Sequence, residues 1–349
     1  MNGSFRIYNR TEEIMTFLRK TSHAMFALAA ATAVFFSGQA DAKTIKVGTG
    51  ISEQHYQYKA LSKFKEYVED KTKGDIKVEI FPNAMLGSDL EVLEAIKLGT
   101  VHMNVPTPSV LGNFVKEFRL PDLPYIFPND KVSAEVARGP WARKLLDMLD
   151  PVGIHGLAVG NFGVRHLTNR VRPITSLEDL KGLKIRTMQN PVILDVFRAL
   201  GTNPTPMGFG EVFSALQTGT IDGQENPYAT ILLSRFYEVQ KHLSNSQHMH
   251  SWDVLVIGKH FYDSLSKEEQ NIVSEGARIF AEYEHEASAK SEKESLDKLI
   301  ATGITYTEIS AENRAKMRAA ALPVIEKHGK AISEKLYDEL IAEIAKVSK

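Results

Sequence analysis

The sequence predicts an α/β protein with two related lobes, and three observations lead to this prediction. Segments that alternate like strands are separated by segments of helical periodicity, which is typical of βαβ units and of a mainly parallel sheet. A run of helix, glycine and strand at 91–101 recurs position for position at 211–221. The segment 266–301 contains no proline, which predicts one very long helix, or two helices that meet near Gly276.

The first lobe is expected to begin with three strands and two helices. The strands are predicted at 44–47, 76–80 and 102–105, and the helices at 58–69 and 90–98. Ser88 and Asp89 precede the second helix and can cap its first turn. Gly99 follows that helix directly and is expected to end it.

The second lobe is expected to follow the same order. Its predicted elements are a strand at 183–185, a helix at 192–200, an extended piece at 205–207, a helix at 211–217 and a strand at 221–223. After the long helix, a final strand at 304–306 precedes a helical tail over 311–349. A helix over 266–301 would extend about 54 Å. Because this is longer than one lobe, we expect the helix to run across the back of both.

Composition narrows the possible functions. The chain has 349 residues, of which 43% are hydrophobic and 24% are charged, as in ordinary globular proteins of about two domains. The net charge is −1 and no basic block stands out, so we expect no nucleic-acid partner. There is no cysteine, which excludes disulfide frameworks, thiolate metal sites and cysteine nucleophiles.

The N-terminal region resembles a secretory signal peptide. Arg19 and Lys20 precede the apolar run 24–36, which is followed by the Ala-Asp-Ala sequence at 40–42. A basic region, a short apolar region and a small-residue cleavage site are typical of such signals. We therefore expect cleavage before Lys43 and export of the remaining chain to the periplasm of a Gram-negative bacterium. The residues before Met15 are interpreted as an N-terminal extension, and the sequence leaves the true start codon open.

The sequence gives little support for a catalytic, nucleotide-binding or metal-binding motif. Gly48 and Gly50 follow a strand, but position 53 is glutamate and not the third glycine of a dinucleotide fingerprint. His248 and His250 lie two apart in a predicted strand, without a carboxylate pattern that would indicate a metal. No nucleophile elbow, phosphate-binding loop or zinc-protease motif occurs. We therefore expect no enzyme, no cofactor and no metal.

Two arginines are better candidates for ligand binding. Arg186 follows the predicted strand 183–185, at the carboxyl edge where open α/β sheets bind ligands. Arg165 follows a predicted turn at 160–163 and has a comparable position. A guanidinium group can pair bidentately with a carboxylate. The alternative is that each arginine forms an ordinary surface ion pair.

Six segments around these arginines carry a resemblance to a known family. They are 82–87 (PNAMLG), 181–186 (KGLKIR), 204–207 (PTPM), 211–217 (EVFSALQ), 222–227 (DGQENP) and 236–241 (FYEVQK). Together they resemble the DctP family, the extracytoplasmic solute-binding proteins of tripartite ATP-independent periplasmic (TRAP) transporters. The resemblance covers the chain from Lys43 to its tail. It implies a two-lobed periplasmic binding protein fold, with the ligand in the cleft and a long helix spanning both lobes.

The resemblance also implies site residues. Arg186 looks like the arginine that holds the ligand carboxylate, Arg165 like a second carboxylate-contacting arginine, and Asn226 like the asparagine that completes the grip. Phe209 resembles an aromatic wall of the pocket. Thr107 stands where sialate-binding members have a glutamate, which argues against sialate. Four further residues are plausible lining residues that the match does not fix: His55, Gln57, Gln189 and Trp252.

The expected function is capture of an organic acid and its delivery to the integral membrane subunits of a TRAP transporter. Lobe one is expected to comprise 43–163 with about 252–290, and lobe two 164–251 with about 291–349. A sugar acid such as a uronate or aldonate is favoured, because the expected lobe-one residues are neutral and offer no second cation for a dicarboxylate. The alternatives are a four-carbon dicarboxylate, a ligand-sensing partner of a sensor kinase, and a secreted hydrolase.

Overall fold

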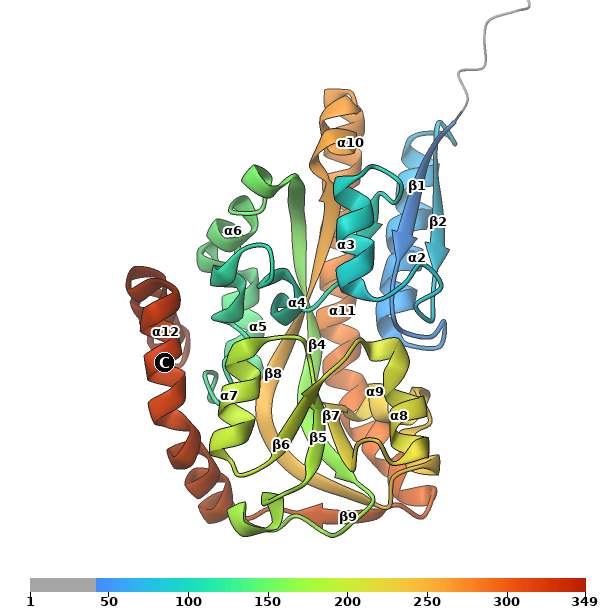
Figure 1. Ribbon diagram of the computed structural model, residues 1–349. Coiled ribbons are helices and arrows are strands. Elements are labelled where there is room, and N and C mark those ends of the chain that lie inside the picture. Colours follow the sequence, from blue (N-terminus) through green and yellow to red (C-terminus); the bar gives the residue numbers. More distant parts are fainter. Residues whose placement is uncertain (1–41) are drawn as a thin grey trace, which may run out of the picture. The chain divides into compact units, whose positions relative to one another are not determined.

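Two long strands form the centre of the protein. The computed structural model describes residues 42–349, so the expected signal peptide and its cleavage site lie outside the described residues. Figure 1 shows β4 (Ile154–Asn169) and β8 (His242–Gly258) running side by side through the middle of the described chain. None of the described helices is long and apolar enough to cross a membrane.

The predicted elements of the first lobe are present within a few residues of their expected ends. They are β1 (Lys43–Gly48), α2 (Tyr56–Lys71), β2 (Ile76–Phe81), α3 (Asp89–Lys97) and β3 (Met103–Asn104). Ser88 caps α3 as expected, in a reciprocal capping box with Glu91. The chain then forms α4 (Pro108–Leu111), α5 (Asp130–Arg138) and α6 (Pro140–Asp147) before it enters β4, with short 3₁₀ turns at Lys116–Arg119 and Asp150–Val152.

The predicted elements of the second lobe are also present. They are β5 (Lys184–Thr187), α7 (Pro191–Ala199), β6 (Asn203–Pro206), α8 (Val212–Thr218) and β7 (Gly223–Pro227), followed by α9 (Tyr228–Leu233). Short 3₁₀ turns lie at Leu177–Leu180, Phe209–Glu211 and Phe236–Glu238. After β8 come α10 (Lys259–Ser264), α11 (Lys267–Ala301), β9 (Thr305–Glu308) and α12 (Ala311–Val347), which is kinked at Ser333.

The sheet is mixed: four of its seven strand pairings with a given register are parallel, in line with the expectation, and the three antiparallel pairings involve the two long strands. Its nine strands are ordered β2-β1-β3-β8-β4-β7-β5-β6, with β9 also paired to β8. β5 pairs in parallel with β6 and β7, and β1 with β3. β8, however, is antiparallel to β3 and β4, and β4 is antiparallel to β7. The two long strands therefore join two parallel βα regions through antiparallel pairing.

The segment 160–163 is also different from the prediction. It lies inside β4 and not in a turn, and the pairing with β8 shifts register between Asn161 and Gly163. Such an irregularity bends a strand without ending it. Arg165 therefore projects from the middle of a long strand.

The segment 267–301 is one continuous helix, which settles the alternative that the sequence left open. Gly276 lies inside α11 and does not break it. A Cβ at this position would lie 3.0 Å from the Phe64 ring in α2. The glycine therefore permits close packing of the two helices. α11 contacts α2, β4 and α9, so it packs against elements of both halves of the molecule, as expected. The lobe boundaries themselves stay a prediction.

A second close approach leads to a prediction about stability. A Cβ at Gly160 would lie 1.8 Å from a carboxyl oxygen of Glu284, and Glu284 is fully buried in α11. Gly160→Ala must therefore displace the buried Glu284 side chain or the helix that carries it, and we expect it to lower the free energy of unfolding by about 1–3 kcal/mol. Chemical denaturation measures this change. Gly210→Ala is the control, because Gly210 is exposed and its nearest neighbour is 3.3 Å away; an equal loss in both variants would contradict the prediction.

Candidate functional site

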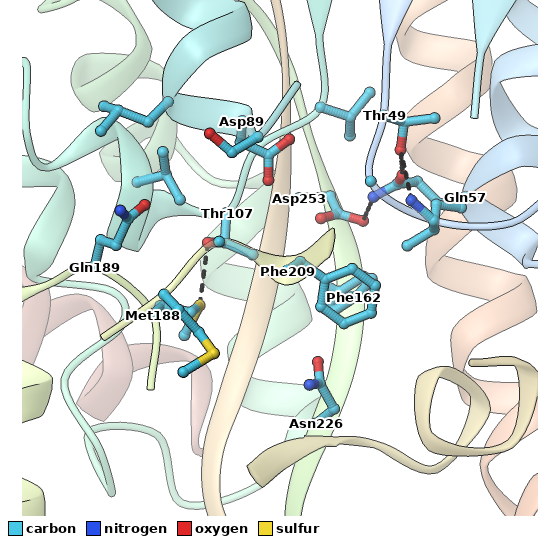
Figure 2. Close-up of a pocket in the computed structure, with 18 of the residues that line it drawn as sticks. Thr49, Gln57, Asp89, Thr107, Phe162, Met188, Gln189, Phe209, Asn226 and Asp253 are labelled. Atoms are coloured by element: carbon cyan, nitrogen blue, oxygen red, sulfur yellow. Dashed lines mark hydrogen bonds between the residues drawn. The ribbon is translucent and has the colours of Figure 1, made fainter. Parts of the chain in front are cut away.

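A cavity lies where the loop after β1, the start of α3 and the ends of β5 and β6 converge on the central strands. It encloses about 610 Å³ of space not filled by atoms, including its opening to solvent. Figure 2 shows part of its wall. Its lining residues are Thr49, Gly50, Ile51, Gln57, Ser88, Asp89, Leu90, Val105, Thr107, Val110, Phe162, Arg165, Arg186, Met188, Gln189, Met207, Gly208, Phe209, Asn226 and Asp253.

Most of the predicted binding residues meet at this cavity. Those that line it are Arg186, Arg165, Asn226, Phe209, Thr107, Gln189 and Gln57. They come from both halves of the sequence, and the long strands bring them together. The cavity is therefore the candidate ligand site.

His55 and Trp252, two of the predicted lining residues, are not among the residues that line this cavity. His55 caps α2, since its Nδ1 accepts from the Gln57 backbone at 3.1 Å, and its Nε2 lies 3.2 Å from the Thr230 hydroxyl. Burial, with a smaller effect of Lys59, lowers the pKa of His55 to about 3. The Trp252 indole donates to the Ser133 hydroxyl at 2.8 Å and packs in the core.

Among the residues that the structure describes, no carboxylate is bound to Arg186, unlike Arg165. Arg186 lies in β5, is 3% exposed, and donates from Nε and Nη2 to the Met207 carbonyl at 3.1 and 2.8 Å. Neither bond engages Nη1. Burial lowers the pKa of Arg186 to about 10, so the side chain is still charged at neutral pH. A buried cation held by one neutral carbonyl is a favourable partner for an incoming anion.

Arg165 already has an anionic partner within the protein. Its Nη2 donates to Glu225 Oε1 at 2.9 Å and to the Glu225 carbonyl at 2.7 Å, and its Nε also contacts the carboxylate. His248 Nε2 lies 3.2 Å from the same carboxylate. Burial alone would raise the pKa of Glu225, but Arg165 and His248 hold it at about 2. The ion pair that the sequence left as an alternative therefore exists, but it is buried and not at the surface.

The cavity is also lined by two carboxyl groups, which the sequence did not identify as binding residues. Asp89 begins α3, and Asp253 lies in β8 directly after Trp252. Burial raises the pKa of Asp89 to about 6, and burial also raises the pKa of Asp253. In Figure 2 Asp89 lies near the top of the view, Asp253 near its centre and Asn226 near the bottom. In the sequence Asp89 had only a capping role, and nothing distinguished Asp253 from a surface aspartate.

A chain of hydrogen bonds holds Asp253 in place. The Thr49 hydroxyl donates to the side-chain oxygen Oε1 of Gln57, and Gln57 Nε2 donates to Asp253 Oδ2 at 2.6 Å (Figure 2). All three side chains are buried and line the cavity. Because each donor is already committed, Asp253 has a fixed orientation toward the space that a ligand would fill.

The remaining wall combines amide and apolar groups. Asn226 donates to the Gln224 side chain at 2.6 Å, which leaves its own carbonyl oxygen outside that bond. Thr107 contacts the Met188 sulfur at 3.3 Å. The rings of Phe162 and Phe209 lie near the centre of the view in Figure 2. Apolar walls with a few fixed polar groups are typical of small-molecule sites.

Comparison with known proteins gives a consistent set of relatives. Residues 47–331 match the family described as bacterial extracellular solute-binding protein, family 7 (DctP). A C4-dicarboxylate-binding periplasmic protein of Rhodobacter capsulatus is 31% identical over 93% of this chain and 98% of its own. Among solved structures, a sugar acid binding protein of Advenella mimigardefordensis in complex with galactonate has a TM-score of 0.85 and 34% identity, covering 87% of this chain and 98% of its own. A TRAP periplasmic solute-binding protein of Sulfurospirillum deleyianum with bound succinate has a TM-score of 0.82 and 30% identity. The match covers 86% of this chain and 98% of its own.

Proposed function

Because the chain belongs to the family 7 extracellular solute-binding proteins, the DctP family, we propose that its cavity binds a hydroxylated monocarboxylate. The family consists of non-enzymatic periplasmic binding proteins of TRAP transporters, so binding and release are the whole of its chemistry. The favoured ligand is a sugar acid, an aldonate or uronate. In this proposal the signal peptide directs export to the periplasm, and membrane subunits of a TRAP transporter receive the ligand.

One observation supports the choice of ligand class: the wall of the cavity holds carboxyl groups as well as arginines. Arg186 offers Nη1 to a carboxylate, with Arg165 and Asn226 beside it in the wall. Asp89 and Asp253 supply acceptors for hydroxyl groups. A second carboxylate near these aspartates would meet like charge, which is costly in a buried site.

The runner-up ligand is a four-carbon dicarboxylate. It is supported by the relatives that bind C4-dicarboxylates or succinate. In that case the two ends of the ligand would have to share Arg186 and Arg165, although Arg165 is already bound to Glu225. The galactonate-bound relative supports the sugar acid more directly.

A thermal-shift screen separates the two ligand classes. A ligand present at 100 times its Kd stabilises the fold by about 2.7 kcal/mol, which raises Tm measurably. We expect galactonate or another aldonate or uronate at millimolar concentration to raise Tm, and succinate and malate to leave it unchanged. A rise with succinate or malate and none with any sugar acid would assign the cavity to dicarboxylates.

The proposed partner is tested by uptake of the same acid. Cells that contain this protein and the membrane subunits encoded nearest to it should take up the bound acid, and deletion of either should abolish uptake. If a sensor kinase is the partner instead, uptake will survive deletion of this protein, while transcription in response to the acid will be lost.

A further inference from the structure

A second carboxyl group lies directly behind the cavity wall, next to Asp253. Glu284 projects from α11 and is 0% exposed, as is Asp253 in β8. It occupies the space left by the absent side chain of Gly160 in β4. The strand glycine and the long helix therefore place one carboxyl group against another at the cavity, and none of the contacts described above requires Glu284.

Three of the four oxygens of this pair have no hydrogen-bond donor. Asp253 Oδ2 accepts from Gln57, but Asp253 Oδ1 and both oxygens of Glu284 have no hydrogen-bond partner among residues 42–349. Ionised carboxylates can only accept, so two of them in contact cannot bond to each other. If one carries a proton, the contact becomes a hydrogen bond between the two groups.

The surroundings do not offer a free cation that would neutralise two negative charges. The charged or titratable groups that act on the pair are Asp89 in α3, Arg165 in β4 and Tyr56 in α2. Asp89 is acidic, Arg165 is bound to Glu225, and the Tyr56 hydroxyl donates to the Phe162 carbonyl. Burial, with the neighbouring carboxyl group, raises the pKa of Glu284 well above its usual range.

We propose that Asp253 and Glu284 share one proton and that Asp253 is the hydroxyl-binding subsite of the cavity. This inference rests on the proposed function. Glu284 holds the proton and donates it to Asp253 Oδ1, while Gln57 donates to Oδ2. Each Asp253 oxygen keeps a lone pair, so the carboxylate can accept from a ligand hydroxyl. The specificity of the site for hydroxyl groups then depends on both residues, although only Asp253 contacts the ligand and Glu284 does not.

The shared proton links ligand affinity to pH. When the pair loses its proton at high pH, two negative charges face an anionic ligand, and affinity falls. Below that range one negative charge remains on the pair. Binding of the anionic ligand in this closed site raises the proton affinity of the pair, so we expect binding at high pH to take up protons.

Calorimetry with galactonate between pH 6 and pH 9 tests this proposal, in two buffers of different ionisation enthalpy to count protons. For the wild type we expect affinity to fall by about tenfold over this range, with proton uptake. Glu284→Gln should bind within about threefold of the wild type at pH 6 and lose the pH dependence, because its amide donates to Asp253 at every pH. Asp253→Asn should bind about 10- to 100-fold more weakly, since a hydrogen bond to a charged acceptor is lost.

Matched controls come from exposed residues of the same type. Glu286→Gln changes an exposed side chain of the same helix, and Asp75→Asn changes an exposed aspartate away from the cavity. Both should behave as the wild type. An unchanged pH profile in Glu284→Gln, or unchanged affinity in Asp253→Asn, overturns the proposal.

Infrared spectroscopy of the ligand-free protein tests the proton independently of any ligand. At pH 7 the wild type should show a protonated-carboxyl stretching band that is absent from Glu284→Gln and present in Glu286→Gln. If that band is identical in all three, the shared proton is refuted even if galactonate binds. If galactonate fails to bind the wild type at any pH, the sugar-acid function and the hydroxyl subsite are both wrong, whereas the band still decides the shared proton.

Discussion

Replacing Arg186 by alanine is expected to weaken ligand binding by about 2–5 kcal/mol, which is a loss of more than tenfold in affinity. The reason is that Arg186 is a buried cation of the cavity with no carboxylate bound to it among residues 42–349. Titration calorimetry with galactonate measures the change. Arg198→Ala is the control, because Arg198 is an exposed arginine of α7 that pairs only with Asp195.

Arg186→Lys tests whether binding requires the planar guanidinium group or only a positive charge. An ammonium group keeps the charge but cannot bond to Met207 and to both oxygens of a carboxylate in one plane. We therefore expect Arg186→Lys to bind more weakly than the wild type. Unchanged affinity in this variant would contradict bidentate binding by Arg186.

Replacing Glu225 by glutamine is expected to lower the free energy of unfolding by about 3–5 kcal/mol, because it leaves the buried Arg165 without its anionic partner. Chemical denaturation at pH 7 measures this loss. Glu275→Gln is the control, since Glu275 pairs with Arg278 at the surface, where an ion pair contributes at most about 1 kcal/mol. Equal stability of Glu225→Gln and the wild type would show that the buried pair is not needed.

The same ion pair predicts a dependence of stability on acid. The folded protein holds the pKa of Glu225 at about 2, below the ordinary value of 4.5 for a glutamate. A carboxylate with a lowered pKa stabilises the fold fully above its unfolded pKa, and this stabilisation is lost as the pH falls from 4.5 toward 2. Glu225→Gln should therefore lose less stability than the wild type over that range. A parallel fall in both proteins would contradict this assignment.

The sequence predicted the short strands and helices because the apolar residues of each recur at a regular spacing and turn or capping residues mark its ends. Ser88 before α3 and Ser266 before α11 both form the capping boxes that mark helix starts. The strands β4 and β8 could not be recognised in the same way. Most of their residues are buried on both faces, so polar and apolar residues do not alternate along them.

Residues of the candidate cavity could be predicted where a residue type and its position agreed. Arg186 at the carboxyl end of β5 is such a case, and Asn226 and Phe209 followed from the family resemblance. Asp253 and Glu284 were not found, because acidic side chains in a sequence are expected to be exposed. Their burial depends on Gly160 and Gln57, which are distant in sequence and meet them only through the crossing of β4, β8, α2 and α11.

His55 and Trp252 are the two predicted lining residues that lie outside the candidate cavity. Both are residue types that often line sugar sites, and both are buried near the centre of the molecule. Each is used by the fold instead, His55 as the cap of α2 and Trp252 as a core residue bonded to Ser133. Residue type alone therefore does not show whether a side chain lines the cavity or serves the fold.

Identification of the small molecule that copurifies with the protein tests the central claim most directly. The protein is purified from the periplasm without refolding, denatured, and the released molecule is identified by mass spectrometry. The cavity of Arg186, Asp89 and Asp253 predicts an acid with one carboxylate and several hydroxyl groups. A released dicarboxylate without hydroxyl groups, such as succinate, or a molecule with no carboxylate, would contradict it.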